Sequence, residues 1–403
     1  MRFHFRKKMN LISKGTGTMQ ENTGKKRFIS ATSFGIMATW FGMHCGSGFA
    51  TGTQYTIYYS KYGWLALVMP FITWAILGGA FYFIFEYERV TKINTYKDYA
   101  QNVFIKKIGI LFVIAIDLWS LCAQMLGVTG ILAGTGSLFE GINLPYYLGV
   151  AIMAVIVLFM TIFGVKTMMK VSSYITYGLI VVILILGIVG VAQNWSNFVW
   201  VVSTRQNDGG TFLDALKSAF TYSGVQIGAM FAVASMAPQL ENRADSAKTA
   251  VGGALLNVLM LQVLGLVVIA NYPAINSEAL PVLAALNNTG IPVLAWLYRI
   301  MLFLALLSTG AGCAFAIVTR WKGIIAKKLN CSETVVAAVI AIVMMLIGAF
   351  GSKFGLVAVF SKGYGFLSKM AWPLGILPAF LILPWRIHFL RTTGKDAPEF
   401  AKK

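Results

Sequence analysis

The chain has 403 residues, of which 58% are hydrophobic and only 12% are charged. A soluble protein of this size could not bury that much apolar surface, and apolar runs of about 20 residues recur along the chain, as bilayer-spanning helices require. The composition therefore excludes an ordinary soluble domain and indicates an all-α polytopic membrane protein. The formal net charge of +19 is explained by basic cytoplasmic loops, so nucleic-acid binding is not needed to account for it.

The hydropathy pattern predicts ten membrane spans. Their approximate bounds are 29–59, 64–85, 109–137, 145–164, 171–193, 212–238, 249–271, 290–319, 333–350 and 364–385. If the N-terminus is cytoplasmic, alternation places 26 of the 33 Lys and Arg residues on the cytoplasmic side. This segregation obeys the positive-inside rule. We therefore expect residues 1–28 and 386–403 to be basic cytoplasmic tails.

Ten spans divide into two units of five, at residues 29–195 and 212–385, which must have opposite orientations. The first span of the first unit carries four Gly residues within 42–52, in the stretch WFGMHCGSGFATGTQ. Each Gly costs about 1 kcal/mol in a helix interior, so this stretch predicts a broken helix that lines a cavity. The first span of the second unit carries Ser223, Gly224 and Gly228. These residues predict a matching break, although small residues also serve close helix packing.

Three motifs indicate a family. They are GSGFATGTQ at 46–54, TYKDYA at 95–100 and GYG at 363–365. With these motifs the chain resembles the LeuT-type fold of the amino acid–polyamine–organocation (APC) superfamily, and within it the YkvI-like bacterial membrane proteins. The resemblance implies a 5+5 inverted repeat with helices 1 and 6 broken. It also implies a location in the bacterial cell membrane and a substrate site near the midplane, between helices 1, 3, 6 and 8.

The resemblance also implies a sodium site that joins span 1 to span 8. Carried over by motif, its ligands are the carbonyl oxygens of Gly42, Cys45 and Ala305 and the hydroxyls of Ser308 and Thr309. Neutral oxygen ligands suit a hard monovalent cation. The alternative is that both hydroxyls bond to carbonyls of their own helix, as Ser and Thr commonly do in membranes. A proton-coupled variant of the family has a Lys in span 5 in place of sodium. In this chain the only candidates are Lys166 and Lys170, which lie at or before the cytoplasmic end of span 5. Their position favours sodium.

The substrate site is expected beside the two breaks. Backbone N–H groups of Gly46, Ser47 and Gly48 could hold a carboxylate, and free carbonyls in the stretch Tyr222, Ser223 and Gly224 could accept from an ammonium group. Further residues could form the walls of the site: Gln54, Trp119, Gln124, Tyr222, Gln226 and Phe231. His44 lies inside the first break, where it could instead be a neutral ring bonded to freed backbone.

Asp117 is an acidic residue at membrane depth in span 3, in the stretch FVIAIDLWSLCAQ. A carboxylate there is costly and is usually functional. Three interpretations stay open: a buried pair with Arg299 of span 8, a role in binding a cationic substrate or a proton, or a position near a membrane surface. Two further loops, 194–210 and 272–289, have apolar runs that predict interfacial or gating segments.

These features together favour a sodium-coupled secondary transporter (symporter) of an amino acid or similar small amine-containing solute. Na⁺ is the coupling ion, and no organic cofactor is expected. The alternatives are a proton-coupled transporter of the same fold and a non-transporting nutrient sensor. No enzyme is expected, because the sequence contains neither H-E-x-x-H nor G-x-S-x-G.

Overall fold

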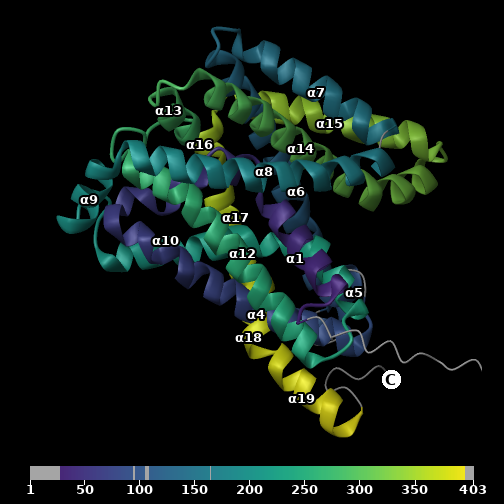
Figure 1. The fold of residues 1–403 in the computed structure, drawn as a ribbon. Helices are drawn as coiled ribbons and strands as arrows, with labels where there is room; N and C mark the ends of the chain where they lie inside the picture. The colour runs from purple at the N-terminus through teal and green to yellow at the C-terminus, as the bar shows by residue number, and fades with distance from the viewer. Residues whose placement is uncertain (1–27, 94–95, 105–108, 164, 395–403) are drawn as a thin grey trace, which may run out of the picture.

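The computed structural model describes residues 28–93, 96–104, 109–163 and 165–394, with the side chains of 96, 163–176 and 232 left out. Residues 1–27 of the first predicted tail and 395–403 of the second therefore lie outside the described residues. Every regular element in the described ranges is helical (Figure 1).

The helices of the first half are α1 (Ala31–His44), α2 (Ser47–Ala50), α3 (Thr53–Tyr58), η1 (Ser60–Leu67), α4 (Met69–Thr91), α5 (Tyr96–Val103), α6 (Gly109–Glu140), α7 (Tyr146–Phe163), α8 (Val165–Gln193) and α9 (Trp195–Ser203). Those of the second half are α10 (Phe212–Gln226), η2 (Ile227–Ala229), α11 (Met230–Val233), η3 (Ala234–Gln239), α12 (Arg243–Ala270), α13 (Pro281–Asn287), α14 (Pro292–Leu329), α15 (Glu333–Ser352), α16 (Leu356–Ala358), η4 (Val359–Tyr364), α17 (Gly365–Ala371), η5 (Trp372–Ile376), α18 (Leu377–Leu381) and α19 (Leu383–Thr393).

Several of these helices can cross a membrane. Among the described residues, six continuous stretches are long and apolar enough to do so: α4, α6, α12, α14, α15 and the run from α16 to α19. The pair α8–α9 would be a seventh, bent by 78°, and α7 is a shorter apolar helix. Span 1 is divided into the short helices α1, α2 and α3, and span 6 is divided into α10, η2, α11 and η3. Each of the ten predicted spans thus corresponds to a helix or to a run of helices.

Local sequence signals explain where the long helices start. The Thr211 side chain accepts from the N–H of Asp214, whose carboxylate accepts in return from the N–H of Thr211, which forms a capping box at α10. Asn242 caps α12, and Ser332 caps α15. Pro292 opens α14, where a missing N–H costs nothing.

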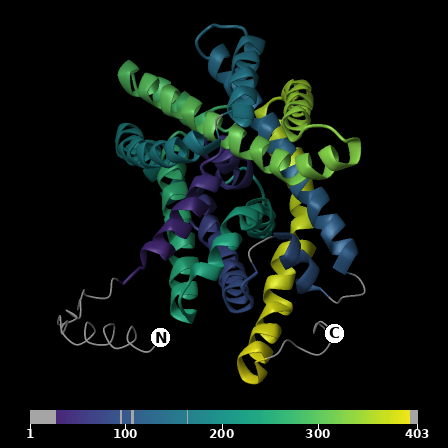
Figure 2. The ribbon, with the colours of Figure 1, turned by 90° about the vertical axis from the view of Figure 1, so that its right-hand side faces the viewer.

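The molecule has two distinct ends. At the end that we call the terminal end, the start of α1, the end of α4, the start of α12 and the end of α19 lie together, since Lys248 lies over the Phe28 ring and Arg391 pairs with Glu86 (Figures 1 and 2). The opposite end, which we call the loop end, carries α9 and α13 (Figure 1). There Trp64 N–H donates to Gln206 O. Which end faces the cytoplasm stays a prediction.

The last span is longer and less regular than expected. Two π-helical segments interrupt it, at Val359–Tyr364 and Trp372–Ile376. The helical run continues to Thr393, past the predicted end at 385. Arg386 can lie within it because its side chain is almost fully buried, donates to Asn102 O and lies over the Tyr87 ring. Residues 386–393 thus continue the helix, and their place on the cytoplasmic side stays a prediction.

Candidate functional site

The first span is broken, as its Gly content predicts. Helix α1 ends at His44, and Gly46 is extended (φ −75°, ψ −168°) before α2 begins. A second interruption follows at Gly52, which has φ +83° between α2 and α3. A Cβ atom at Gly52 would also lie 2.6 Å from Val282 Cγ2. Gly is therefore required at position 52 both by its backbone conformation and by the close approach of α13.

The interruption of the sixth span lies later than expected. Helix α10 continues to Gln226 and passes into the 3₁₀ turn η2, and the N–H of Ile227 donates to Ser223 O. The stretch 222–224 therefore belongs to α10, and Ser223 Oγ donates to Ala219 O. A Cβ atom at Gly224 would lie 2.7 Å from Ser368 O of α17. Gly224 thus serves helix packing, and the carbonyl oxygen of Gln226 lies at the interruption, 3.2 Å from His44 Nε2.

The segment between the two interruptions of span 1 is tied to the loop end. Tyr298 of α14 donates its hydroxyl to Ala50 O. Thr53 Oγ1 donates to Ala279 O at 2.7 Å, and the N–H of Val282 donates to Thr51 O at 3.3 Å. The predicted 272–289 segment therefore contains a helix, α13, which packs on the broken part of span 1.

A buried cluster of polar side chains joins span 1 to span 6. Gln54 Oε1 accepts from the Tyr222 hydroxyl at 2.9 Å and from Gln226 Nε2 at 3.0 Å. Gln226 Nε2 also donates to the Tyr222 hydroxyl at 2.5 Å. All three side chains are at least 93% buried. Within the described residues, nothing accepts from Gln54 Nε2 and nothing donates to Gln226 Oε1. A donor and an acceptor are therefore left available in this cluster.

The two Gly residues beside this cluster, Gly48 and Gly130, lie too close to neighbouring side chains to carry a Cβ atom of their own. A Cβ atom at Gly48 would lie 2.5 Å from Gln54 Cδ, so the Gln54 amide packs directly on the backbone of α2. A Cβ atom at Gly130 of α6 would lie 3.0 Å from Ser47 Oγ. The resulting site brings together α2, α3, α6 and α10.

His44 links α1 to both η2 and α12. Its Nδ1 lies 2.9 Å from Asn257 Oδ1, and its Nε2 lies 3.2 Å from Gln226 O. Asn257 Nδ2 donates to Gly253 O at 2.8 Å, which leaves Oδ1 facing His44 as an acceptor. His44 Nδ1 must then be the donor. A neutral ring with its hydrogen on Nδ1 has none on Nε2 to donate to Gln226 O, so a bond of His44 to freed backbone stays a prediction.

Two observations fit the implied sodium ligands. Along the described chain, no N–H donates to the carbonyl oxygens of Gly42 and Cys45, because the helical ladder stops at the break. Thr309 of α14 lies at this break, since a Cβ atom at Gly46 would be 3.1 Å from Thr309 Cγ2 and 3.4 Å from its Oγ1. Ala305 is buried one turn earlier in α14, and Ser308 is half-buried. The side chains of Lys166 and Lys170 lie outside the described residues.

Asp117 pairs with Arg320 and not with Arg299. Arg320 Nε lies 3.0 Å from Asp117 Oδ1, and Arg320 Nη2 lies 2.5 Å from Oδ2. Arg299 instead donates to Asn287 Oδ1 at 3.0 Å. The reason is helix register, because Asp117 and Arg320 both lie toward the terminal half of their helices, whereas Arg299 lies near the opposite end of α14.

Two other predicted wall residues, Trp119 and Phe231, lie by the interruption of span 6. Trp119 packs against Phe231, with ring centroids 5.0 Å apart. Trp119 precedes Gly130, which contacts Ser47, by 11 residues along α6, or roughly 16 Å at 1.5 Å per residue. Gln124 is half-buried and lies roughly 9 Å from Gly130 by the same measure. A Cβ atom at Gly375 would lie 3.4 Å from Ile227 Cγ1 of η2 and 3.6 Å from Trp119 Cη2, so Trp119 lies near the interruption of span 6.

The sequence analysis does not predict three residues that lie near the site, namely Asn257, Tyr58 and Phe360. Asn257 holds His44, and a signal for it exists, since it is a polar residue in a very apolar span. Tyr58 donates its hydroxyl to Phe360 O at 2.8 Å, which brings the π-helical segment of the last span to the site. π-Helical turns often occur at functional sites, but nothing in the sequence near Phe360 predicts one.

Comparison with known proteins supports a fold and not a family. No family model and no curated protein matches the sequence. Among solved structures, Mhp1 in an inward-facing conformation matches with a TM-score of 0.63 and 15% identity, over 92% of this chain and 79% of that one. A Na⁺-coupled sialic acid symporter in a substrate-bound outward-open state matches with a TM-score of 0.60 and 15% identity, over 87% of this chain and 79% of that one.

A manganese transporter from Eremococcus coleocola also matches, with a TM-score of 0.55 and 14% identity, over 85% of this chain and 78% of that one. These three proteins carry different solutes, so the likeness does not reach the substrate. The resemblance to YkvI-like proteins stays a prediction. The broken first span, the apolar helices and these structural matches together show that the chain has the LeuT-type transporter fold.

Proposed function

We propose that this protein is a sodium-coupled secondary transporter of an amino acid or a similar small amine-containing solute. The observation that carries the proposal is the contact of Gln54 with Tyr222 and Gln226, which joins the broken first span to the sixth span beside the break. In transporters with broken helices, the substrate site lies where the two interrupted helices meet.

The cluster offers neutral groups that match a zwitterion. Gln54 Nε2 can donate to a carboxylate, and Gln226 Oε1 can accept from an ammonium group. Asp117 is engaged by Arg320 and is therefore not expected to serve as the counter-ion of a cationic amine. Recognition would then depend on neutral hydrogen bonds, which favours a net-neutral solute over a cationic one.

The sodium site would lie on the other side of the same break. Gly42 and Cys45 would offer their carbonyl oxygens, Ala305 a third, and Ser308 and Thr309 their hydroxyls. A bound Na⁺ would hold α1 against α14 and so favour one conformation of the transporter. A ligand shifts such an equilibrium only by its difference in affinity for the two states, and sodium and substrate would be coupled through the shared break.

The test is the thermal stability of the purified full chain in sodium, potassium or choline at equal ionic strength, with a panel of amino acids and amines. We expect sodium to stabilise the wild type, one panel member to add to this effect, and the double variant Ser308→Ala/Thr309→Ala to lose both. The control variant Thr221→Ala removes a hydroxyl that donates to Lys217 O one turn earlier in α10, and it should keep the sodium response.

Two outcomes would direct attention to the alternatives. Stabilisation that follows pH and ignores sodium would support the proton-coupled transporter. Sodium-dependent binding without accumulation of the solute in proteoliposomes under a sodium gradient would support the sensor. Accumulation that collapses when the gradient is removed would support the symporter.

A further inference from the structure

Arg299 is a cation within an apolar helix that has no carboxylate partner in the described part of the chain. It lies seven residues after Pro292, roughly 10 Å along α14 at 1.5 Å per residue. Among the described residues, no salt bridge reaches it. A charge at this depth is costly unless an opposite charge or strong hydrogen bonds compensate it.

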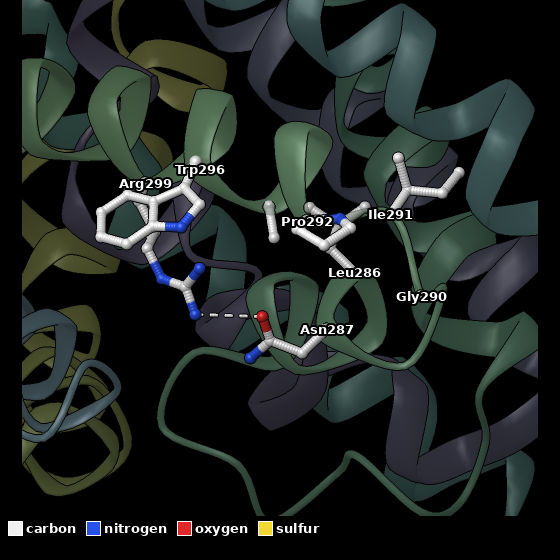
Figure 3. Close-up of a pocket in the computed structure, with 8 residues that line it drawn as sticks. Leu286, Asn287, Gly290, Ile291, Pro292, Trp296 and Arg299 are labelled. Atoms are coloured by element: carbon white, nitrogen blue, oxygen red, sulfur yellow. Dashed lines mark hydrogen bonds between the residues drawn. The ribbon is translucent and has the colours of Figure 1, made fainter.

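The guanidinium group is only partly satisfied by its neighbours. Nη2 donates to the Asn287 amide oxygen at 3.0 Å. Nε is buried and has no acceptor, and no described residue accepts from Nη1. The Trp296 ring lies against the group, with its centroid 5.2 Å from Cζ (Figure 3). Within the described ranges, one neutral oxygen and one aromatic face are thus the contacts offered to this cation.

A cavity lies beside this group. It has a volume of about 180 Å³ and is formed where α13 meets the start of α14. Its lining includes Asn287, Gly290, Pro292, Trp296 and Arg299 (Figure 3). For comparison, an engineered cavity of about 150 Å³ holds a benzene molecule in another protein. A phosphate group with part of its ester therefore fits.

The surroundings of the cavity indicate a lipid. Val293, Trp296 and Ile300 are 78%, 51% and 56% exposed on the same helix. Exposed apolar side chains on a membrane-spanning helix face lipid, and Trp concentrates at the level of the headgroups. A cation that borders such a surface lies within reach of lipid phosphates and away from bulk water.

We propose that this cavity is a binding site for the phosphate group of an anionic membrane lipid, with Arg299 as its ligand. Arg forms charge-assisted hydrogen bonds with phosphate, and here Nη1 has no acceptor among the described residues. The bound lipid would join α13 to α14 at the loop end. Because α13 also packs on Thr51 through Val282, the lipid would brace the outer wall of the broken span.

The experiment uses the full chain, purified in a neutral detergent and delipidated. Phosphatidylglycerol, phosphatidylcholine and inorganic phosphate are each added, and bound lipid is counted by native mass spectrometry while thermal stability is followed. We expect one tightly bound phosphatidylglycerol in the wild type. Arg299→Gln should weaken it roughly 10- to 100-fold, as expected for the loss of charge-assisted hydrogen bonds.

Asn287→Asp is a second variant that keeps Arg299 and the shape of the site. It places a carboxylate 3.0 Å from Nη2, which should neutralise the guanidinium and displace the lipid. Lys353→Gln is the matched control, because Lys353 is also a cation beside exposed aromatic rings, those of Phe350 and Phe354. It should keep the bound lipid.

Three results would overturn the proposal. The first is equal lipid binding by the wild type, Arg299→Gln and Asn287→Asp. The second is equal stabilisation by phosphatidylcholine, which would remove the preference for an anionic lipid. The third is equal stabilisation by inorganic phosphate, which would identify a site for soluble anions. None of these results depends on the substrate or the coupling ion, so the proposal is tested independently of the transport function.

Discussion

Asp117 of α6 and Arg320 of α14 form a two-pronged ion pair, with nitrogen–oxygen distances of 3.0 and 2.5 Å. Their side chains are only 12% and 22% exposed, respectively. The two residues are 203 positions apart in the sequence, and the pair joins a helix of the first half to a helix of the second half. It therefore acts as a brace between the two halves of the molecule.

Removing either member of this brace should destabilise the protein. We expect Asp117→Asn and Arg320→Gln each to cost about 1–3 kcal/mol, because the remaining charge is left partly buried without its partner. The double variant should cost much less than the sum. Thermal unfolding of the four proteins in a double-mutant cycle measures this coupling.

The exposed pair Lys322–Glu333 provides the control for that cycle. Its nitrogen–oxygen distance is 3.2 Å, but its side chains are 39% and 58% exposed. Exposed pairs contribute little, so the same cycle on Lys322 and Glu333 should give a small coupling. Additive effects of Asp117→Asn and Arg320→Gln would show that the pair is not a brace.

The Tyr222 hydroxyl should matter for binding more than for folding. Tyr222→Phe removes the hydrogen bond to Gln54 Oε1 and the one that the hydroxyl accepts from Gln226 Nε2. We expect substrate affinity to fall roughly tenfold, as for a lost hydrogen bond of about 1.5 kcal/mol. Binding by isothermal titration with the solute that stabilises the wild type measures this effect.

Tyr82→Phe is the matched control for this change. The Tyr82 hydroxyl accepts from Arg243 Nε at the terminal end, away from the break. Its loss should leave the affinity unchanged. Equal affinity of wild type and Tyr222→Phe would remove Tyr222 from the substrate site.

Gly46 should be sensitive to a single methyl group. In Gly46→Ala the new Cβ atom would lie 3.1 Å from Thr309 Cγ2, so α1 and α14 must separate by a few tenths of an ångström. We expect the sodium-dependent rise in melting temperature to shrink or disappear. The melting curve in sodium and in choline is the measurement.

Gly35→Ala separates this effect from the general effect of adding a methyl group to α1. Nothing lies within 4 Å of a Cβ atom at Gly35. Ala is favoured over Gly in a helix by up to about 1 kcal/mol, so this variant should be as stable as the wild type or more stable. A normal sodium response in Gly46→Ala would argue against the proposed sodium site.

Gly63 should be irreplaceable at the loop end. It has φ +53°, and a Cβ atom there would lie 1.7 Å from Gln206 O. The same oxygen accepts from the N–H of Trp64, so the 204–211 loop would have to move away. We expect Gly63→Ala to cost about 3 kcal/mol or more in unfolding free energy, from strain and steric clash together.

Gly290→Ala is the control that separates the two costs of Gly63→Ala, namely backbone strain at a positive φ and the steric clash of the new Cβ atom. Gly290 has φ +69°, but nothing lies within 4 Å of a Cβ atom there. Strain alone should cost about 1–2 kcal/mol. Limited proteolysis of the 204–211 loop should accelerate in Gly63→Ala and not in Gly290→Ala, and equal rates would contradict the role assigned to Gly63.

The interruption in the first span illustrates what could be predicted from the sequence. Gly46 and Gly52 weaken a helix by a local property, namely the absence of a side chain, and the break follows in whatever context the residues lie. The apolar spans are local in the same sense, since each is recognised by its own composition. Helices α4, α6, α12, α14 and α15 accordingly lie where hydropathy places them.

The sixth span illustrates the limit of such local reasoning. Gly224 has the same composition signal as Gly46, yet it lies in a continuous helix because Ser368 of α17 packs against its backbone. A Gly that permits close packing and a Gly that interrupts a helix look alike in the sequence. Only the neighbouring helix decides between them.

The sequence by itself thus determined the all-helical class, the approximate spans and the first break, because hydrophobicity and glycine content act over a few residues. Tertiary structure alone decided that Asp117 meets Arg320 and that Gln54 meets Tyr222. It also decided that Trp119 packs against Phe231, just after the interruption of span 6. These contacts join residues up to 203 positions apart, and they depend on the register and rotation of packed helices, which no local pattern encodes.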